Sequence, residues 1–122
     1  MSSPQHDPPT SKTVLIIDDE EDIRDALRLM CETNGFHVVG EAENGVEAVP
    51  LALRFQPDFV ILDYLLPRLD GEGAAEILRA ITPESKIVAF SAILERQPPW
   101  ADAFLNKERV GELMPLLRTL IR

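Results

Sequence analysis

Short apolar runs that end beside a polar or charged side chain recur along this sequence of 122 residues. Val14–Ile17 is continuous and rich in β-branched residues, which is typical of a strand covered on both faces. Phe59–Leu62 and Lys86–Phe90 repeat this pattern, and stretches with helical spacing separate the runs. Strands that alternate with helices predict a parallel sheet with helices on both faces.

The remaining elements follow from the same reasoning. We expect five strands, at Val14–Ile17, Phe36–Ala42, Phe59–Leu62, Lys86–Phe90 and Ala103–Leu105. A first helix follows Asp19 or Glu20 and stops at Asn34-Gly35; three more are expected at Gly45–Phe55, Gly73–Ala80 and Arg109–Ile121. In Gly45–Phe55 we expect Val46, Val49 and Leu53 to face inward and Pro50 to loosen or kink the helix. Residues 1–11 are rich in proline and serine and predict a disordered tail, so that the folded domain is 12–122.

The connection between the last two strands breaks the alternation. Fifteen residues separate Ser91 from Lys107, and their middle reads Gln-Pro-Pro-Trp at 97–100. Neither proline can donate a helix hydrogen bond, and Pro99 disfavours the helical conformation of Pro98. We therefore expect an irregular crossover or a single turn, with Trp100 covering the apolar surface that a helix would otherwise cover.

Composition narrows the class of protein. The chain has the length of one domain, and 45% apolar residues suffice for an ordinary core. The net charge of −9 argues against direct binding of nucleic acid by this chain. No apolar stretch approaches membrane-spanning length or forms a signal peptide, so a cytoplasmic location is expected. The single cysteine, Cys31, is interpreted as a packing residue of the first helix.

Chemically active side chains gather at the predicted strand ends. Asp18 and Asp19 follow the first strand and Asp63 follows the third. Ser91 ends the fourth strand and Lys107 follows the fifth. The carboxyl ends of parallel strands form the functional edge of an open α/β sheet. Three carboxylates repel one another, and a hard divalent ion such as Mg²⁺ relieves that repulsion, so this edge predicts a site for Mg²⁺ and a phosphoryl group.

Four segments together resemble the receiver domain of two-component response regulators. They are Val-Leu-Ile-Ile-Asp-Asp-Glu-Glu at 14–21, Asp-Tyr-Leu-Leu-Pro-Arg-Leu-Asp-Gly at 63–71, Phe-Ser-Ala at 90–92 and Ala-Phe-Leu-Asn-Lys at 103–107. Each segment is weak alone, but all four occur in order and each lies at a strand end. The resemblance implies a doubly wound, flavodoxin-like sheet of five parallel strands in the order 2-1-3-4-5, here with the fourth crossover helix shortened or missing.

The resemblance also implies a role for each residue. Asp63 would take a phosphoryl group from a sensor histidine kinase or a histidine phosphotransfer protein. Asp18, Asp19, Asp63 and the backbone carbonyl of Leu65 would hold Mg²⁺, and Lys107 and Ser91 would contact phosphoryl oxygens. Phe104 would rotate inward when Ser91 moves, switching the binding of an output partner that the sequence does not identify.

Other interpretations remain open. Asp18 and Asp19 could cap a helix, Asp63 could begin a turn, and Phe104 could be an ordinary core residue. A pseudo-receiver would keep the fold as a protein-interaction module without the phosphorylation switch. A phosphatase of the dehalogenase type needs an acid/base Asp two residues after its nucleophile, where this chain has Leu65, so an enzyme with a separate substrate is not expected.

Two departures from the family affect the output. The missing crossover helix remodels the face through which most receivers report phosphorylation. Leu65 and Ile93, two residues after Asp63 and Ser91, are both apolar, and we expect them to orient attacking water poorly. The hypothesis is a long-lived phosphorylated form; an unchanged dephosphorylation rate in a Leu65→Asn variant would contradict it.

Overall fold

A single sheet of five parallel strands organises the chain. The computed structural model describes residues 10–64, 71–93 and 95–121. The strand order is β2-β1-β3-β4-β5, as predicted. The strands are β1 (Thr13–Ile17), β2 (His37–Ala42), β3 (Phe59–Leu62), β4 (Lys86–Ser91) and β5 (Ala103–Asn106). Residues 1–9 of the expected tail lie outside the described residues, so the tail boundary stays a prediction. Within the described residues, the Thr10 backbone N–H donates to the Gly35 carbonyl at 3.0 Å.

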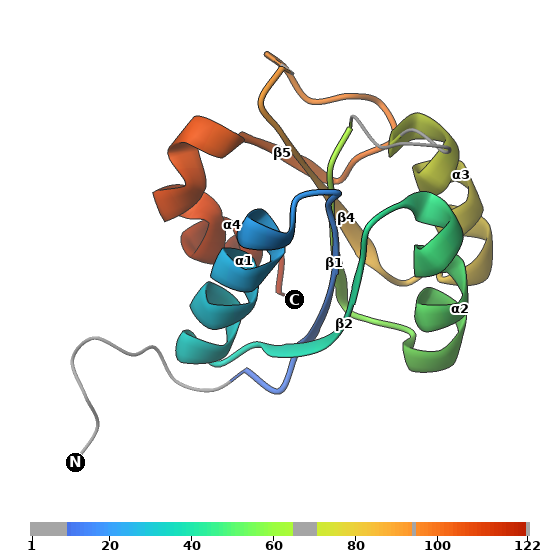
Figure 1. Cartoon of the computed structure of the whole chain (residues 1–122), viewed down its shortest axis with the longest axis horizontal. Coiled ribbons are helices and arrows are strands. Elements are labelled where there is room, and N and C mark those ends of the chain that lie inside the picture. The colour runs from blue at the N-terminus through green and yellow to red at the C-terminus, as the bar shows by residue number, and fades with distance from the viewer. Residues whose placement is uncertain (1–9, 65–70, 94, 122) are drawn as a thin grey trace.

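The helices cover both faces of this sheet. They are α1 (Glu21–Thr33), α2 (Gly45–Phe55), α3 (Gly71–Ile81) and α4 (Leu113–Thr119), and a 3₁₀ helix, η1 (Lys107–Glu112), precedes α4. Figure 1 shows α1 and α4 on one side of the sheet and α2 and α3 on the other. Within the described part of the chain, no helix has the length and apolar character needed to cross a membrane.

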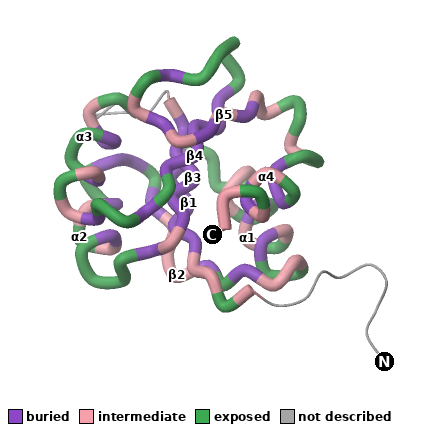
Figure 2. The backbone as a smooth tube through the Cα atoms, turned by 180° about the vertical axis from the view of Figure 1, so that it is seen from behind, coloured by how far each residue is buried: buried purple, intermediate pink, exposed green. Residues whose placement is uncertain are grey.

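The core has two layers because consecutive strand residues point to opposite faces. In β1, Val14 and Ile16 pack with the layer that includes α1 and α4, whereas Leu15 and Ile17 pack with the layer of α2 and α3. All four side chains are buried, and Figure 2 shows the strands as the buried centre of the molecule. The sheet is therefore covered on both faces, as its continuous apolar runs predict.

The prediction for the inward face of α2 was wrong for Val46 and Leu53, whereas Val49 is half-buried. Val46 and Leu53 are 54% and 60% exposed, and Ala48 and Ala52 are buried instead. The small alanine side chains let α2 lie close to the sheet and to α3. The Asn44 side chain accepts from the Glu47 backbone N–H at 2.9 Å and caps this helix. Helical spacing fits either apolar stripe of α2, so spacing alone does not determine which one is buried.

Two prolines, Pro50 and Pro115, lie within helices, and neither of them ends its helix. Pro50 is exposed, and α2 continues past it from Gly45 to Phe55. The expected final helix, Arg109–Ile121, is replaced by η1 and the shorter α4. Pro115 lies in the first turn of α4, where a backbone N–H has no partner within the helix. The α-helix therefore begins just before Pro115, and the residues before it adopt the tighter 3₁₀ form.

The crossover between β4 and β5 is irregular, as predicted. Its described residues form bends and a turn but no helix, and the Ala101 N–H donates to the Pro98 carbonyl at 3.1 Å. Trp100 packs against the core layer of α2 and α3, where it covers apolar surface. Arg79 of α3 donates to the Trp100 carbonyl at 3.2 Å and to Asp102 Oδ2 at 2.7 Å. These contacts anchor the crossover to α3 in the absence of a helix.

Candidate functional site

Asp18 and Asp63 lie side by side at the carboxyl edge of the sheet. Asp18 follows β1 and Asp63 follows β3, and these two strands are neighbours in which Ile17 pairs with Leu62. The Asp63 backbone N–H donates to the Ile17 carbonyl at 3.0 Å. Both aspartates are buried, with 1% and 5% exposure. Two carboxylates are thus held close together and largely out of water.

Lys107 connects the two carboxylates. It begins η1 directly after β5, and its Nζ lies 2.8 Å from Asp18 Oδ2 and 3.4 Å from Asp63 Oδ2. The ammonium balances part of the charge that two buried carboxylates create. Burial lowers the pKa of Lys107, but contacts with Asp18 and then Asp63 outweigh burial, and the pKa is raised above its ordinary value. The ammonium therefore stays charged at neutral pH.

Asp18 has an oxygen suited to a metal ion. Its Oδ1 accepts from the Glu20 backbone N–H at 3.0 Å. Its Oδ2 is buried and lies 2.8 Å from Lys107 Nζ, so this oxygen already faces a positive charge. One carboxylate oxygen from each of Asp18, Asp19 and Glu20 lies within 4.8 Å of the others. An all-oxygen, acidic group of this kind fits a hard divalent cation such as Mg²⁺.

The structure places the other predicted residues as follows. Ser91 ends β4, is buried, and accepts from the Ile93 backbone N–H through Oγ at 3.3 Å. Phe104 is half-buried in β5 and lines a surface hollow together with Pro115 and Leu116. Asp19 is exposed at the start of the loop before α1. Leu65 lies outside the described residues, so its predicted role as a metal ligand is not addressed.

Glu20 is a site residue that the sequence reasoning missed. Its carboxylate belongs to the acidic group with Asp18 and Asp19, and its Oε1 lies 3.8 Å from Lys107 Nζ. The uninterrupted acidic run at 18–22 was the available signal. We considered Glu20 only as a residue after which the first helix could begin, and it does occupy the N-cap position of α1, without a side-chain capping bond.

Cys31 takes no part in this site. It is buried in the core layer of α1 and α4, and burial raises the pKa of its thiol to about 12. A thiol with so high a pKa is not a nucleophile at neutral pH. This agrees with the interpretation of Cys31 as a packing residue.

The fold and the acidic edge together define a class of signalling domain, and comparison with known sequences agrees. Residues 14–108 match the sequence profile of the response regulator receiver domain. The chain therefore belongs to the family of response regulator receiver domains.

Individual relatives agree with this assignment. The transcriptional regulatory protein PdtaR of Mycobacterium tuberculosis is 39% identical over 116 residues, which cover 90% of this chain and 57% of that protein. This chain spans about half the length of the curated relatives that it matches.

Two solved structures share the fold. The response regulator domain of Thermotoga maritima CheB has a TM-score of 0.81 at 22% identity, covering 90% of this chain and 96% of that domain. The receiver domain of the Pseudomonas aeruginosa sensor histidine kinase PA1611, described with a magnesium ion in its active-site cleft, has a TM-score of 0.79. It is 24% identical and covers 90% of this chain and 97% of that domain.

Proposed function

We propose that this domain is a phosphorylation-dependent receiver in which Asp63 accepts a phosphoryl group. The observation that carries the proposal is the contact of one ammonium, that of Lys107, with two buried carboxylates from neighbouring strands. Asp63 is the carboxylate assigned as nucleophile because the resemblance to receiver domains implies that role for it, and it directly follows the central strand β3, between β1 and β4. Lys107 and Asp18 then flank the position where the phosphoryl oxygens carry charge.

The proposed step is a phosphoryl transfer to Asp63. A carboxylate oxygen of Asp63 forms a bond to phosphorus while the P–N bond of a donor phosphohistidine breaks. The leaving imidazole nitrogen keeps the electron pair of that bond and takes a proton from water. Lys107 exchanges its contact with Asp63 Oδ2 for one with a phosphoryl oxygen, where its positive charge stabilises the transferred group.

We propose Mg²⁺ as the cofactor, with Asp18, Asp19 and Asp63 as ligands; Glu20 lies within 4.8 Å of the Asp18 and Asp19 carboxylates and could also contribute an oxygen. Bound Mg²⁺ would neutralise charge on the phosphoryl group and on the carboxylates during transfer. The position of Asp18 Oδ2 supports this assignment because this buried oxygen is already stabilised by a cation, the Lys107 ammonium at 2.8 Å. Leu65, the remaining proposed ligand, lies outside the described residues.

The proposed switch couples Ser91 to Phe104. In the described structure the Ser91 hydroxyl only accepts a hydrogen bond, so its proton is available for a phosphoryl oxygen. Ser91 pairs with Asn106 across β4 and β5, and Phe104 lies on the same short strand β5. A movement of Ser91 towards the phosphoryl group would open space beside β5, which the half-buried Phe104 can fill.

The proposed donor is a sensor histidine kinase or a histidine phosphotransfer protein, and the proposed location is the cytoplasm. A net charge of −9 supports the view that this domain does not bind nucleic acid directly. We propose no reaction on a separate substrate.

A pseudo-receiver is the second candidate, and the irregular crossover favours it. In that case the crossover and α4 surfaces would bind a partner whether or not Asp63 is phosphorylated. The described crossover contains no helix, so the usual phosphorylation-reporting face is altered. The two candidates differ in one measurable property, which is whether Asp63 accepts phosphoryl groups.

Intact mass spectrometry separates the two candidates. The protein is incubated with Mg²⁺ and a small-molecule phosphodonor such as acetyl phosphate, beside Asp63→Ala and Asp25→Ala variants. Asp25 is an exposed aspartate of α1 and serves as the matched control. We expect one phosphoryl adduct in the wild type and in Asp25→Ala, and none in Asp63→Ala. An adduct that survives in Asp63→Ala would refute the assignment of the nucleophile.

A further inference from the structure

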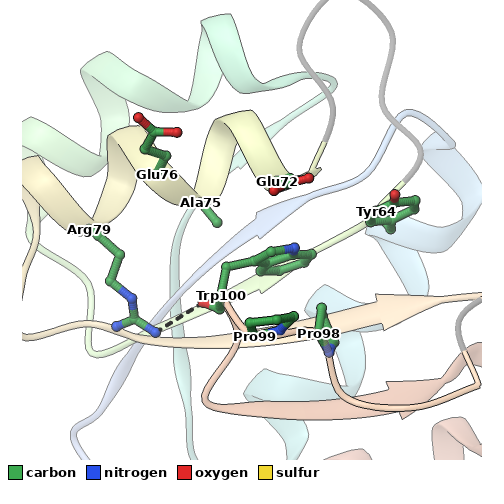
Figure 3. A pocket seen from close by; sticks show the side chains of 8 residues that line it. All are labelled: Tyr64, Glu72, Ala75, Glu76, Arg79, Pro98, Pro99 and Trp100. Carbon is green, nitrogen blue, oxygen red and sulfur yellow. Dashed lines mark hydrogen bonds between the residues drawn. The ribbon is translucent and has the colours of Figure 1, made fainter.

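A pocket of about 550 Å³ lies between α3 and the irregular crossover. Tyr64, the residue that follows Asp63, forms part of its lining. Its apolar wall is formed mainly by Tyr64, Pro98, Pro99 and Trp100 (Figure 3). The rings of Tyr64 and Trp100 are nearly parallel, at 5°, with centroids 6.3 Å apart. Both side chains are only partly buried, so the aromatic pair can offer surface to a ligand.

The wall of this pocket is held in place by hydrogen bonds. Arg79 donates to the Trp100 carbonyl at 3.2 Å, to the Ser85 carbonyl at 3.2 Å and to Asp102 Oδ2 at 2.7 Å. Figure 3 shows the Arg79 side chain reaching from α3 to the backbone of Trp100. A crossover fixed in this way loses little conformational freedom on binding, which favours affinity.

The charges around the pocket favour a cation. Glu72 and Glu76 lie one turn apart on α3 and line the pocket. Both are exposed, and neither has an ion-pair or hydrogen-bond partner within the described ranges. The positive charge of Arg79 is already balanced by Asp102. The net charge of −9 on the whole chain also attracts cations.

The geometry points to a docking site for an arginine side chain carried on a segment of a partner protein. The planar guanidinium stacks on the Tyr64–Trp100 pair and is paired by the carboxylates of Glu72 and Glu76, a combination for which arginine is better suited than lysine. Pockets of about 300–1,000 Å³ hold drug-sized ligands, so the apolar neighbours of the arginine have room to cover Pro98 and Pro99. This site goes beyond phosphoryl acceptance and does not depend on it.

Trp100 is the only tryptophan of the chain, so its fluorescence reports directly on this pocket. The unphosphorylated full chain is titrated at low salt with the blocked pentapeptide Ala-Leu-Arg-Leu-Ala. The same peptide with citrulline, which is neutral and similar in shape, is the ligand control, and blocked single arginine tests for a free small cation. Titration calorimetry run in parallel detects binding that leaves the emission unchanged.

We expect saturable binding of the arginine peptide, at least tenfold weaker binding of the citrulline peptide, and still weaker binding of blocked arginine. A Glu72→Gln/Glu76→Gln double variant should bind the arginine peptide at least fivefold more weakly. Glu84→Gln changes an exposed glutamate that lines no part of this pocket and should leave the affinity unchanged.

The proposal is overturned if neither method detects binding of the arginine peptide, or if citrulline substitutes for arginine without loss. An unchanged affinity in the double variant also overturns it. Blocked arginine that binds as tightly as the pentapeptide would show a site for small cations instead of a partner segment.

Discussion

The contact between Asp102 and the start of β4 gives a quantitative prediction of stability. Asp102 Oδ2 accepts from Arg79 Nη2 and from the backbone N–H of Ile87, both at 2.7 Å. Ile87 is buried, so its N–H has little access to water if this acceptor is removed. An Asp102→Ala variant removes both interactions, whereas Asp102→Asn can keep an oxygen acceptor for Ile87 and removes only the charge.

The two substitutions should differ by a measurable amount. A buried donor left without a partner costs about 1–3 kcal/mol. The ion-pair side chains are 36% and 28% exposed, so solvent screening limits the pair to about 0.2–1 kcal/mol. We therefore expect Asp102→Ala to lower the free energy of unfolding by about 2–3 kcal/mol and Asp102→Asn by about 1 kcal/mol or less.

Urea denaturation followed by circular dichroism and by Trp100 fluorescence measures this difference. With a urea slope of about 1–3 kcal/mol per M, Asp102→Ala should shift the midpoint down by roughly 1 M. Glu112→Ala is the control because the Arg109–Glu112 ion pair is on the surface, and its midpoint should not change. Equal losses in Asp102→Ala and Asp102→Asn would refute the reasoning, since the Ile87 hydrogen bond would then contribute nothing.

Three further predictions concern the core and the site. Cys31 should resist a thiol reagent at pH 8 in the native protein and react once urea unfolds the chain, because burial raises its pKa to about 12; equal rates would contradict this. Ala52→Lys should lower the free energy of unfolding by about 3 kcal/mol or more, while Leu53→Lys should change it by no more than about 0.5 kcal/mol, as urea titrations can establish. The pKa of Lys107 is higher in the folded protein than in the unfolded chain, so its charge stabilises the fold. This stabilisation is complete below the unfolded pKa of about 10.4 and is lost as the pH rises through the pKa of the folded state. Wild type and Lys107→Met should therefore converge in stability above that pH, and a constant difference would refute the assignment.

The sheet was predictable because its signals are local and repeated. Continuous apolar runs such as Val14–Ile17 indicate strands buried on both faces, and the confirmed strand order is the one that the family resemblance implies. The irregular crossover was equally predictable, since adjacent prolines at 98 and 99 exclude a regular helix there.

Features that depend on packing between elements were not predictable. The buried stripe of α2 depends on how closely alanines let the helix approach the sheet, which helical spacing does not encode. The anchoring of the crossover by Arg79 and Asp102 joins residues 23 positions apart, and neither residue stood out in the sequence. The stacking of Tyr64 on Trp100 also follows from tertiary structure alone.

The candidate site also has a part that the sequence could predict and a part that it could not. Strand ends predicted that Asp18, Asp63 and Lys107 would meet, because the carboxyl ends of parallel strands share one edge. The structure places the Lys107 ammonium in contact with both carboxylates. The proximity of Glu20 to this group depends on the turn after β1, in which Asp18 Oδ1 accepts from the Glu20 N–H, and spacing along the strand could not predict it.

Localisation of the phosphoryl group by peptide mass spectrometry tests the central claim most directly. The protein is treated with acetyl phosphate across a range of Mg²⁺ concentrations, and occupancy is measured on the peptide that contains Asp63. The account predicts occupancy on Asp63 alone, rising with Mg²⁺, sensitive to hydroxylamine as an acyl phosphate is, and strongly reduced in Asp18→Asn. A folded protein that shows no occupancy at saturating Mg²⁺, or occupancy on another residue, would contradict the account and favour the pseudo-receiver.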